Sequence, residues 1–82
     1  MSKLIDEPIK VHQDKDSSIT AFIWRRRLYR VFEVIDQWRE PAEWWNGEEM
    51  RIFFRVNAKN SGTGVYELCQ LGKEWFLSRV LD

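Results

Sequence analysis

The stretch from Ile19 to Glu40, ITAFIWRRRLYRVFEVIDQWRE, lies in the longest part of the chain without glycine or proline. Its first six residues are mostly β-branched or aromatic types, which favour strands. Phe22 and Trp24 lie two positions apart, so they share one face of such a strand. The apolar pattern then breaks and resumes at Leu28. We interpret the break as the turn of a β-hairpin, although it contains no glycine, asparagine or aspartate to supply a positive φ. The turn residues are Arg25, Arg26 and Arg27.

The rest of this stretch, residues 28–40, fits either a strand or a helix. As a strand, it places Tyr29 and Val31 on one face. Val34 and Trp38 share the other face unless a bulge at Val34, or at the residue before it, shifts the register. As a helix, its apolar residues form one stripe, made of Leu28, Val31, Phe32, Ile35 and Trp38. We favour the strand because most of these residues prefer sheets and because no N-cap residue precedes the segment.

The remaining sequence predicts further short strands separated by polar or glycine-containing turns. They cover residues 9–12, 49–58, 64–71 and 75–81. We therefore predict an all-β fold, a single small domain whose five- or six-stranded antiparallel meander curls into a barrel-like sheet. Since Pro8 interrupts regular structure, residues 1–7 are expected to form a flexible N-terminal tail and residues 8–82 the β domain.

The composition is that of a folded domain, because 44% of the residues are hydrophobic and 15% are aromatic. The expected core consists of Trp24, Tyr29, Val31, Trp38, Ile52, Phe54, Val56, Leu68, Trp75 and Leu77. Thirteen basic and thirteen acidic residues cancel, so the net charge does not favour a nucleic-acid or membrane partner. With one cysteine, no signal sequence and no long apolar run, we expect a cytoplasmic protein that does not associate with membranes.

The densest basic cluster of the sequence lies at the expected hairpin tip. It consists of Arg25, Arg26, Arg27 and Arg30. Guanidinium groups bind phosphates, and the nearby Trp24 and Tyr29 could stack on a base. Alternatively, the cluster is a solvated turn whose charges pair with Glu33 or Asp36, or which protects an edge strand from pairing with another chain.

A second arrangement follows from the alternation in residues 49–58, where Arg51, Phe53 and Arg55 share one face. A row of arginine, aromatic and arginine on a sheet is one way in which domains hold single-stranded nucleic acid. The alternative is structural: the two arginines pair across strands with Glu33, Asp36 or Glu67, and their stems cover the aromatic ring.

The adjacent residues Trp44 and Trp45 point in opposite directions in an extended chain, so one ring is expected in the core and the other partly exposed, and Trp45 is the candidate binding residue. An exposed tryptophan can anchor a partner. Alternatively, both rings close the open end of a barrel. The single histidine, His12, has no evident nucleophile or carboxylate beside it, and no motif indicates a cofactor or a metal site, so we expect no enzymatic role.

Several short motifs resemble a small bacterial family of uncharacterised domains over residues 8–82. They are Pro8-Ile9 with Val11, Phe22-x-Trp24, Tyr29-Arg30-Val31, Val34, Trp38-Arg39-Glu40, Trp44-Trp45, Arg55-Val56, Tyr66-Glu67-Leu68 and Trp75-x-Leu77. Some members of that family are encoded beside Y-family polymerase-like proteins of damage-induced mutagenesis, so the resemblance implies a DNA-linked accessory role. It defines no catalytic residue. Relatives often have a glycine in the turn that is Arg25–Arg27 here, so the arginine tip is partly particular to this chain.

These observations predict a binding module with two alternative partners. One is nucleic acid, bound as a DNA-repair accessory protein through an arginine and aromatic surface. The other is a protein, or a second copy of the chain, bound through an open sheet edge and an exposed tryptophan. The two differ in whether the arginines form one continuous face or are scattered and matched by carboxylates.

Overall fold

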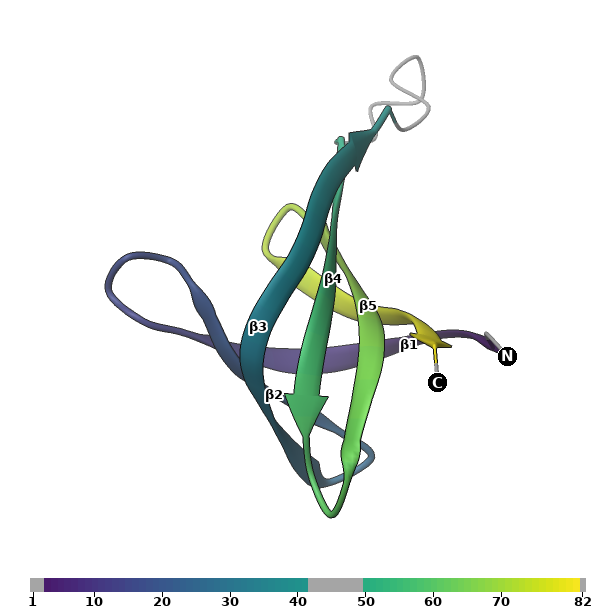
Figure 1. The fold of residues 1–82 in the computed structure, drawn as a ribbon. Helices are drawn as coiled ribbons and strands as arrows, with labels where there is room; N and C mark the ends of the chain where they lie inside the picture. Colours follow the sequence, from purple (N-terminus) through teal and green to yellow (C-terminus); the bar gives the residue numbers. More distant parts are fainter. Residues whose placement is uncertain (1–2, 42–49, 82) are drawn as a thin grey trace.

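The computed structural model describes residues 3–41 and 50–81, which form six strands and no helix (Figure 1). The strands are β1 Lys3–Gln13, β2 Ile19–Trp24, β3 Arg27–Glu40, β4 Arg51–Lys59, β5 Thr63–Leu71 and β6 Glu74–Leu81. Each strand pairs antiparallel with the next, and β1 pairs with β6 to close a barrel. The expected all-β meander in a single domain is therefore confirmed. Among the described residues there is no helix that could cross a membrane. Trp44 and Trp45 lie outside the described residues.

The favoured strand in the second half of the opening stretch is also confirmed, and it contains two β-bulges. Val31 and Glu33 face consecutive residues of β4, as do Val34 and Asp36, which leaves Phe32 and Ile35 as the extra residues. Each bulge shifts the alternation of the strand by one position. Val34 therefore faces the buried Val56, whereas Trp38 faces Phe53 on the other side of the sheet.

The first strand begins earlier than expected. We predicted a tail up to Glu7, but β1 starts at Lys3 and runs along β6 as far as Ile9. Two local features make this possible. A register shift surrounds Asp6, whose φ is 56°, a conformation that aspartate tolerates better than most residues. At Pro8 the strand pairs with β6 alone, so the missing N–H does not interrupt a second ladder.

The barrel encloses a core of buried side chains, formed by Ile19, Phe22, Tyr29, Val56, Ala58, Leu68, Trp75 and Leu77. The expected residues Trp24, Val31 and Phe54 pack against it. Two core predictions were wrong. The bulge at Ile35 turns Trp38 to the outer face of the sheet. Ile52 pairs with Arg39, in the part of β3 and β4 that extends beyond the pairing of β3 with β2.

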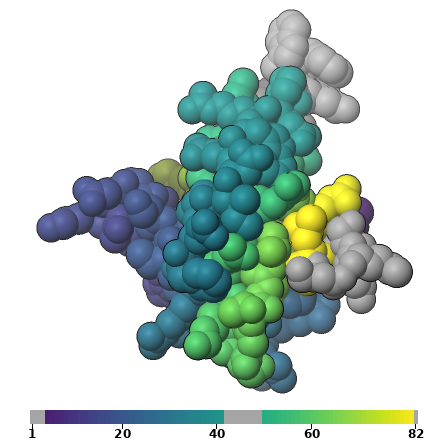
Figure 2. Space-filling view, viewed as in Figure 1, coloured from purple at the N-terminus to yellow at the C-terminus, as the bar shows by residue number. Residues whose placement is uncertain are grey.

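The strands close into a barrel, but beyond Arg30 one edge of β3 has no partner strand among the described residues. β2 pairs with β3 only between Arg27 and Arg30 and then diverges with β1 in a hairpin that projects from the barrel (Figure 1). Within the described residues, β3 beyond Arg30 pairs only with β4. Its side chains lie on the surface along most of this length (Figure 2), and the exposed apolar ones are Phe32, Val34 and Ile35.

Stability is expected to fall at alkaline pH because of two groups on β5. Burial raises the pKa of the Tyr66 phenol and of the Cys69 thiol above their ordinary values of 10.0 and 9.0. The unfolded chain therefore loses these protons first, so rising pH favours unfolding. We expect an unchanged free energy of unfolding between about pH 7 and 8 and a decline above about pH 9. Urea unfolding at a series of pH values across this range measures the free energy of unfolding. In Cys69→Ala, the decline should begin only near the ordinary pKa of tyrosine, and an identical curve would contradict the assignment.

Candidate functional site

The outer face of β4 is a ladder of polar and aromatic side chains. Because Val56 and Ala58 point into the core, the alternate residues point outward: Arg51, Phe53, Arg55, Asn57 and Lys59. In the same order, the β3 residues directly opposite are Glu40, Trp38, Asp36, Glu33 and Arg30. Residues directly opposite each other in antiparallel strands share a face. Every cation of this ladder therefore faces a carboxylate except at the last rung, where Lys59 faces Arg30.

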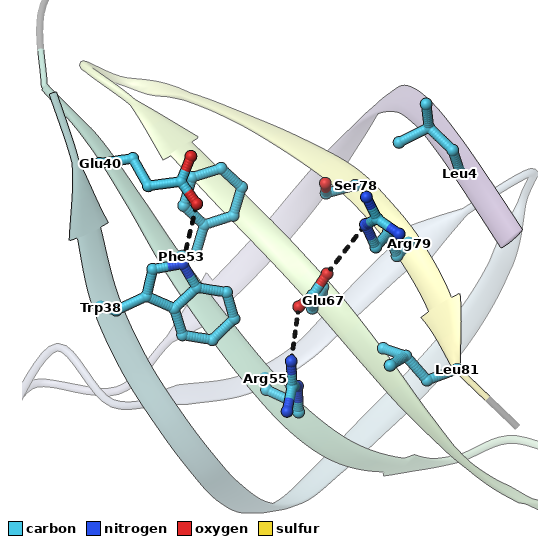
Figure 3. Close-up of a pocket in the computed structure, with 9 residues that line it drawn as sticks. All are labelled: Leu4, Trp38, Glu40, Phe53, Arg55, Glu67, Ser78, Arg79 and Leu81. Carbon is cyan, nitrogen blue, oxygen red and sulfur yellow. Dashed lines mark hydrogen bonds and ion pairs between the residues drawn. The ribbon is translucent and has the colours of Figure 1, made fainter. Parts of the chain in front are cut away.

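The centre of the ladder is an ion-paired cleft of about 390 Å³ (Figure 3). The buried Glu67 of β5 accepts a hydrogen bond of 2.9 Å from Nη2 of Arg55 and lies 3.6 Å from Nε of Arg79. Trp38 stacks on Phe53 with a centroid distance of 5.5 Å, and the Arg55 guanidinium lies over the Trp38 ring. For Arg55, these contacts match the structural alternative, in which carboxylates and ring contacts engage the arginine. For Arg51, the structure shows only that Glu40 lies directly opposite.

The β2–β3 turn contains just two residues, because Trp24 pairs with Arg27. Arg25 and Arg26 occupy it with φ values of 52° and 65°. Arg25 and Arg26 therefore form the expected turn, in a conformation for which Asn-Gly is usual, whereas Arg27, also expected in the turn, is the first residue of β3. Arg25 is held in place: its Nη2 lies 2.7 Å from Oε2 of Glu7, and its guanidinium covers the Trp24 ring. The same carboxylate accepts a hydrogen bond from Trp24 Nε1.

The remaining cations at this end of the barrel form what we call the basic end, which consists of Arg26, Arg27, Arg30 and Lys59. All four are exposed, and none makes an ion pair with a carboxylate among the described residues. The β2–β3 and β4–β5 turns lie side by side here (Figure 1), joined by a hydrogen bond from Asn60 Nδ2 to the Leu28 carbonyl oxygen. Like charges directly opposite each other destabilise a sheet. The Arg30–Lys59 rung holds two cations side by side, with no ion-paired carboxylate among the described residues.

The aromatic residues beside the basic end differ from those expected. Tyr29 is buried and stacks on Phe22 at 5.0 Å, and Arg25 covers Trp24, so the proposed stacking of a base on Tyr29 or Trp24 is wrong. The exposed ring is Phe32, with 59% of its surface accessible. Sequence reasoning missed Phe32 and Lys59. The spacing Arg30-x-Phe32 was a usable signal, but the bulge that turns this ring outward depends on the register with β4.

The strained turn provides a prediction about stability. Arg26→Gly should raise the free energy of unfolding by roughly 0.5–1 kcal/mol, because a left-handed non-glycine residue costs about 1–2 kcal/mol and the entropy of glycine offsets part of it. Arg27→Gly is the matched control. Arg27 is not among the residues with positive φ, so glycine at this position should lower the free energy of unfolding. Urea unfolding checks both, and a destabilised Arg26→Gly would contradict the strain argument.

Other polar clusters have local structural roles. Asp14 Oδ1 accepts hydrogen bonds from the backbone N–H groups of Asp16 and Ser18, and this closes the β1–β2 turn. His12 is exposed at the end of β1. Within residues 3–41 and 50–81, no three histidine, cysteine or carboxylate side chains gather into a set that could hold a metal ion.

Comparison with known proteins assigns the chain to a family. The model of a domain of unknown function, DUF6504, matches residues 1–82, so the chain belongs to this family. The resemblance to a family of uncharacterised domains is confirmed to this extent. No curated protein and no solved structure matches the chain.

Proposed function

We propose that this protein is a nucleic-acid-binding accessory module, rather than an enzyme, and that the basic end contacts the phosphates. One observation carries the proposal: four exposed cations gather at two adjoining turns, without carboxylate partners among the described residues, in a chain of zero net charge. Arginine forks and lysine ammonium groups are the usual ligands of phosphate oxygens. The attraction is therefore local and does not arise from the overall charge.

The backbone of the turn supports the same proposal. A strained conformation is retained where the surrounding structure or the function requires it, and Asn-Gly would form this turn at lower cost. Arg25 is explained by its contacts with Glu7 and Trp24, whereas Arg26 has no such contact in the described structure. The genomic setting implied by the sequence resemblance makes DNA the first nucleic acid to test. Arg51 and Arg55 are left out of the proposed surface because each faces a carboxylate.

The test is DNA binding across a salt series, with variants matched in charge. For four phosphate contacts on a single strand, the slope of log affinity against log salt should be about −3, at about −0.7 per contact. Arg30→Ala/Lys59→Ala should roughly halve this slope. Arg39→Ala/Arg51→Ala removes the same charge from the opposite end of β3 and β4 and should leave the slope unchanged. Absence of binding at about 50 mM salt, or equal losses in both double variants, would reject the proposal.

A second candidate function is binding of a protein or a second copy of the chain at the open edge of β3. It is favoured by the edge of β3 beyond Arg30, which has no partner strand in residues 3–41 and 50–81, and by the exposed side chains of Phe32, Val34 and Ile35. The two bulges, with Glu33 and Asp36 beside them, are features that protect edges from strand addition. Sedimentation equilibrium tests whether the edge of β3 associates with a second copy or is protected from doing so. A mass that rises with protein concentration supports self-association, and a constant monomer mass counts against it.

A further inference from the structure

Phe32 lies where a bulge sets it apart from the core. It is the extra residue between Val31 and Glu33, whose β4 partners Ala58 and Asn57 are adjacent. The ring is 59% accessible and makes no ring contact within the described structure. Together with the exposed Val34 and Ile35, the ring forms an apolar stretch on the surface of β3, and such stretches are typical of binding surfaces.

The charged residues around Phe32 indicate what the ring could contact. Arg30 precedes it by two residues, about 7 Å along the strand, and Lys59 lies directly opposite Arg30. The next polar residue, Glu33, is held by a hydrogen bond of 2.6 Å from Nδ2 of Asn57. Beyond it, the carboxylates of Asp36 and Glu40 are matched by Arg55 and Arg51 directly opposite. An anionic chain is therefore attracted to Phe32 from the basic end rather than along this charge-matched part of the ladder.

We propose that the ligand is single-stranded nucleic acid, with Phe32 as the stacking platform for an unpaired base and the Arg30–Lys59 rung as the clamp for the adjacent phosphate. This inference rests on the proposed function. An aromatic face beside a cationic groove is the arrangement by which proteins bind single strands without reading their sequence. Bases in a duplex are already stacked on each other, so Phe32 gains no such contact there. The site spans from Arg26 to Phe32, which suits a few nucleotides.

The second bulge of β3 provides a matched control. Ile35 is also an extra, exposed apolar residue, but it lies beside Asp36, which pairs with Arg55, away from the basic end. A protein partner that covers the apolar side chains of β3 would use both residues, whereas a stacked base requires only the phenylalanine ring. Comparing substitutions at the two positions therefore separates the two kinds of partner.

The experiment is fluorescence anisotropy at about 50 mM salt with labelled oligothymidine of about twelve nucleotides and a duplex of equal length. We expect the single strand to bind more tightly than the duplex. Phe32→Leu should weaken single-strand binding by about 5- to 100-fold and leave duplex binding unchanged, because it retains bulk and loses the π face. Phe32→Trp should restore single-strand binding, and Ile35→Ala should have no effect on it.

The outcomes separate this inference from the proposal on which it rests. Failure of both oligonucleotides to bind rejects the proposed function itself. Duplex binding as tight as single-strand binding, or a Phe32→Leu variant that binds the single strand like the original chain, rejects the stacking role and leaves the phosphate-binding function standing. Equal losses of single-strand affinity in Phe32→Leu and Ile35→Ala also reject the stacking role and indicate a general apolar contact instead. Thermal unfolding of each variant verifies that the barrel remains folded.

Discussion

Replacing Phe22 with alanine is expected to lower the free energy of unfolding by about 3–5 kcal/mol. The side chain is fully buried at the centre of an aromatic cluster, stacked on Tyr29 at 5.0 Å and in edge contact with Tyr66 at 5.4 Å. Alanine leaves a cavity and removes both ring contacts. Since small domains are stable by only about 5–15 kcal/mol, much of the total stability should be lost. Urea unfolding followed by tryptophan fluorescence measures the change.

The matched control is Phe32→Ala, which makes the same substitution at an exposed ring. Because 59% of Phe32 is accessible, this variant should lose less than about 1 kcal/mol. The comparison cancels the intrinsic difference between phenylalanine and alanine in a strand. Similar losses at both positions would show that the core described above is not the one that stabilises the barrel.

Replacing Glu67 with alanine is expected to cost about 2 kcal/mol, the second large effect on stability. Its buried carboxylate lies between the guanidinium groups of Arg55 and Arg79, and its removal leaves two cations without their partner. Losing one side of a fully buried pair costs about 3–5 kcal/mol, but the arginine side chains are 38% and 48% exposed, so solvent screens part of the penalty.

A double-mutant cycle isolates this interaction. In an Arg55→Ala background, the cost of Glu67→Ala should fall markedly, because one of the stranded cations is already absent. Glu74→Ala is the control for the loss of a carboxylate, since Glu74 is exposed at the start of β6. Equal costs for Glu67→Ala in the two backgrounds would mean that the ion pair does not stabilise the sheet.

The strands were predictable because alternation of apolar and polar residues is a local property. It placed Tyr29 and Val31 on the core face and Phe53 and Arg55 on the other. The bulges of β3 were not predictable in detail, because an extra residue is defined only by its partners in β4. The start of β1 was missed for a similar reason: Lys3 and Leu4 are ordered by pairing with β6, at the other end of the sequence.

The candidate site was also predictable from the sequence only where its residues are close together in the chain. The arginine turn could be read from the sequence, because its residues are consecutive. The Arg30–Lys59 rung could not, since the two cations are far apart in the chain and meet only through the register of β3 and β4. Whether an arginine is available to a ligand also depends on cross-strand contacts. Glu7 holds Arg25 and Glu67 holds Arg55, and neither pairing follows from spacing.

The most direct test of the basic end as the binding surface is a titration of isotope-labelled protein with a short single-stranded oligonucleotide, followed by amide chemical shifts. We predict the largest changes at the two adjoining turns and along the start of β3. The residues concerned are Arg26, Arg27, Arg30, Phe32, Lys59, Asn60 and Ser61. Signals from Trp38, Arg51 and Arg55 should stay close to their original positions. Changes centred on the Trp38, Arg51 and Arg55 ladder instead, or no changes at all, would show that the basic end is not the binding surface.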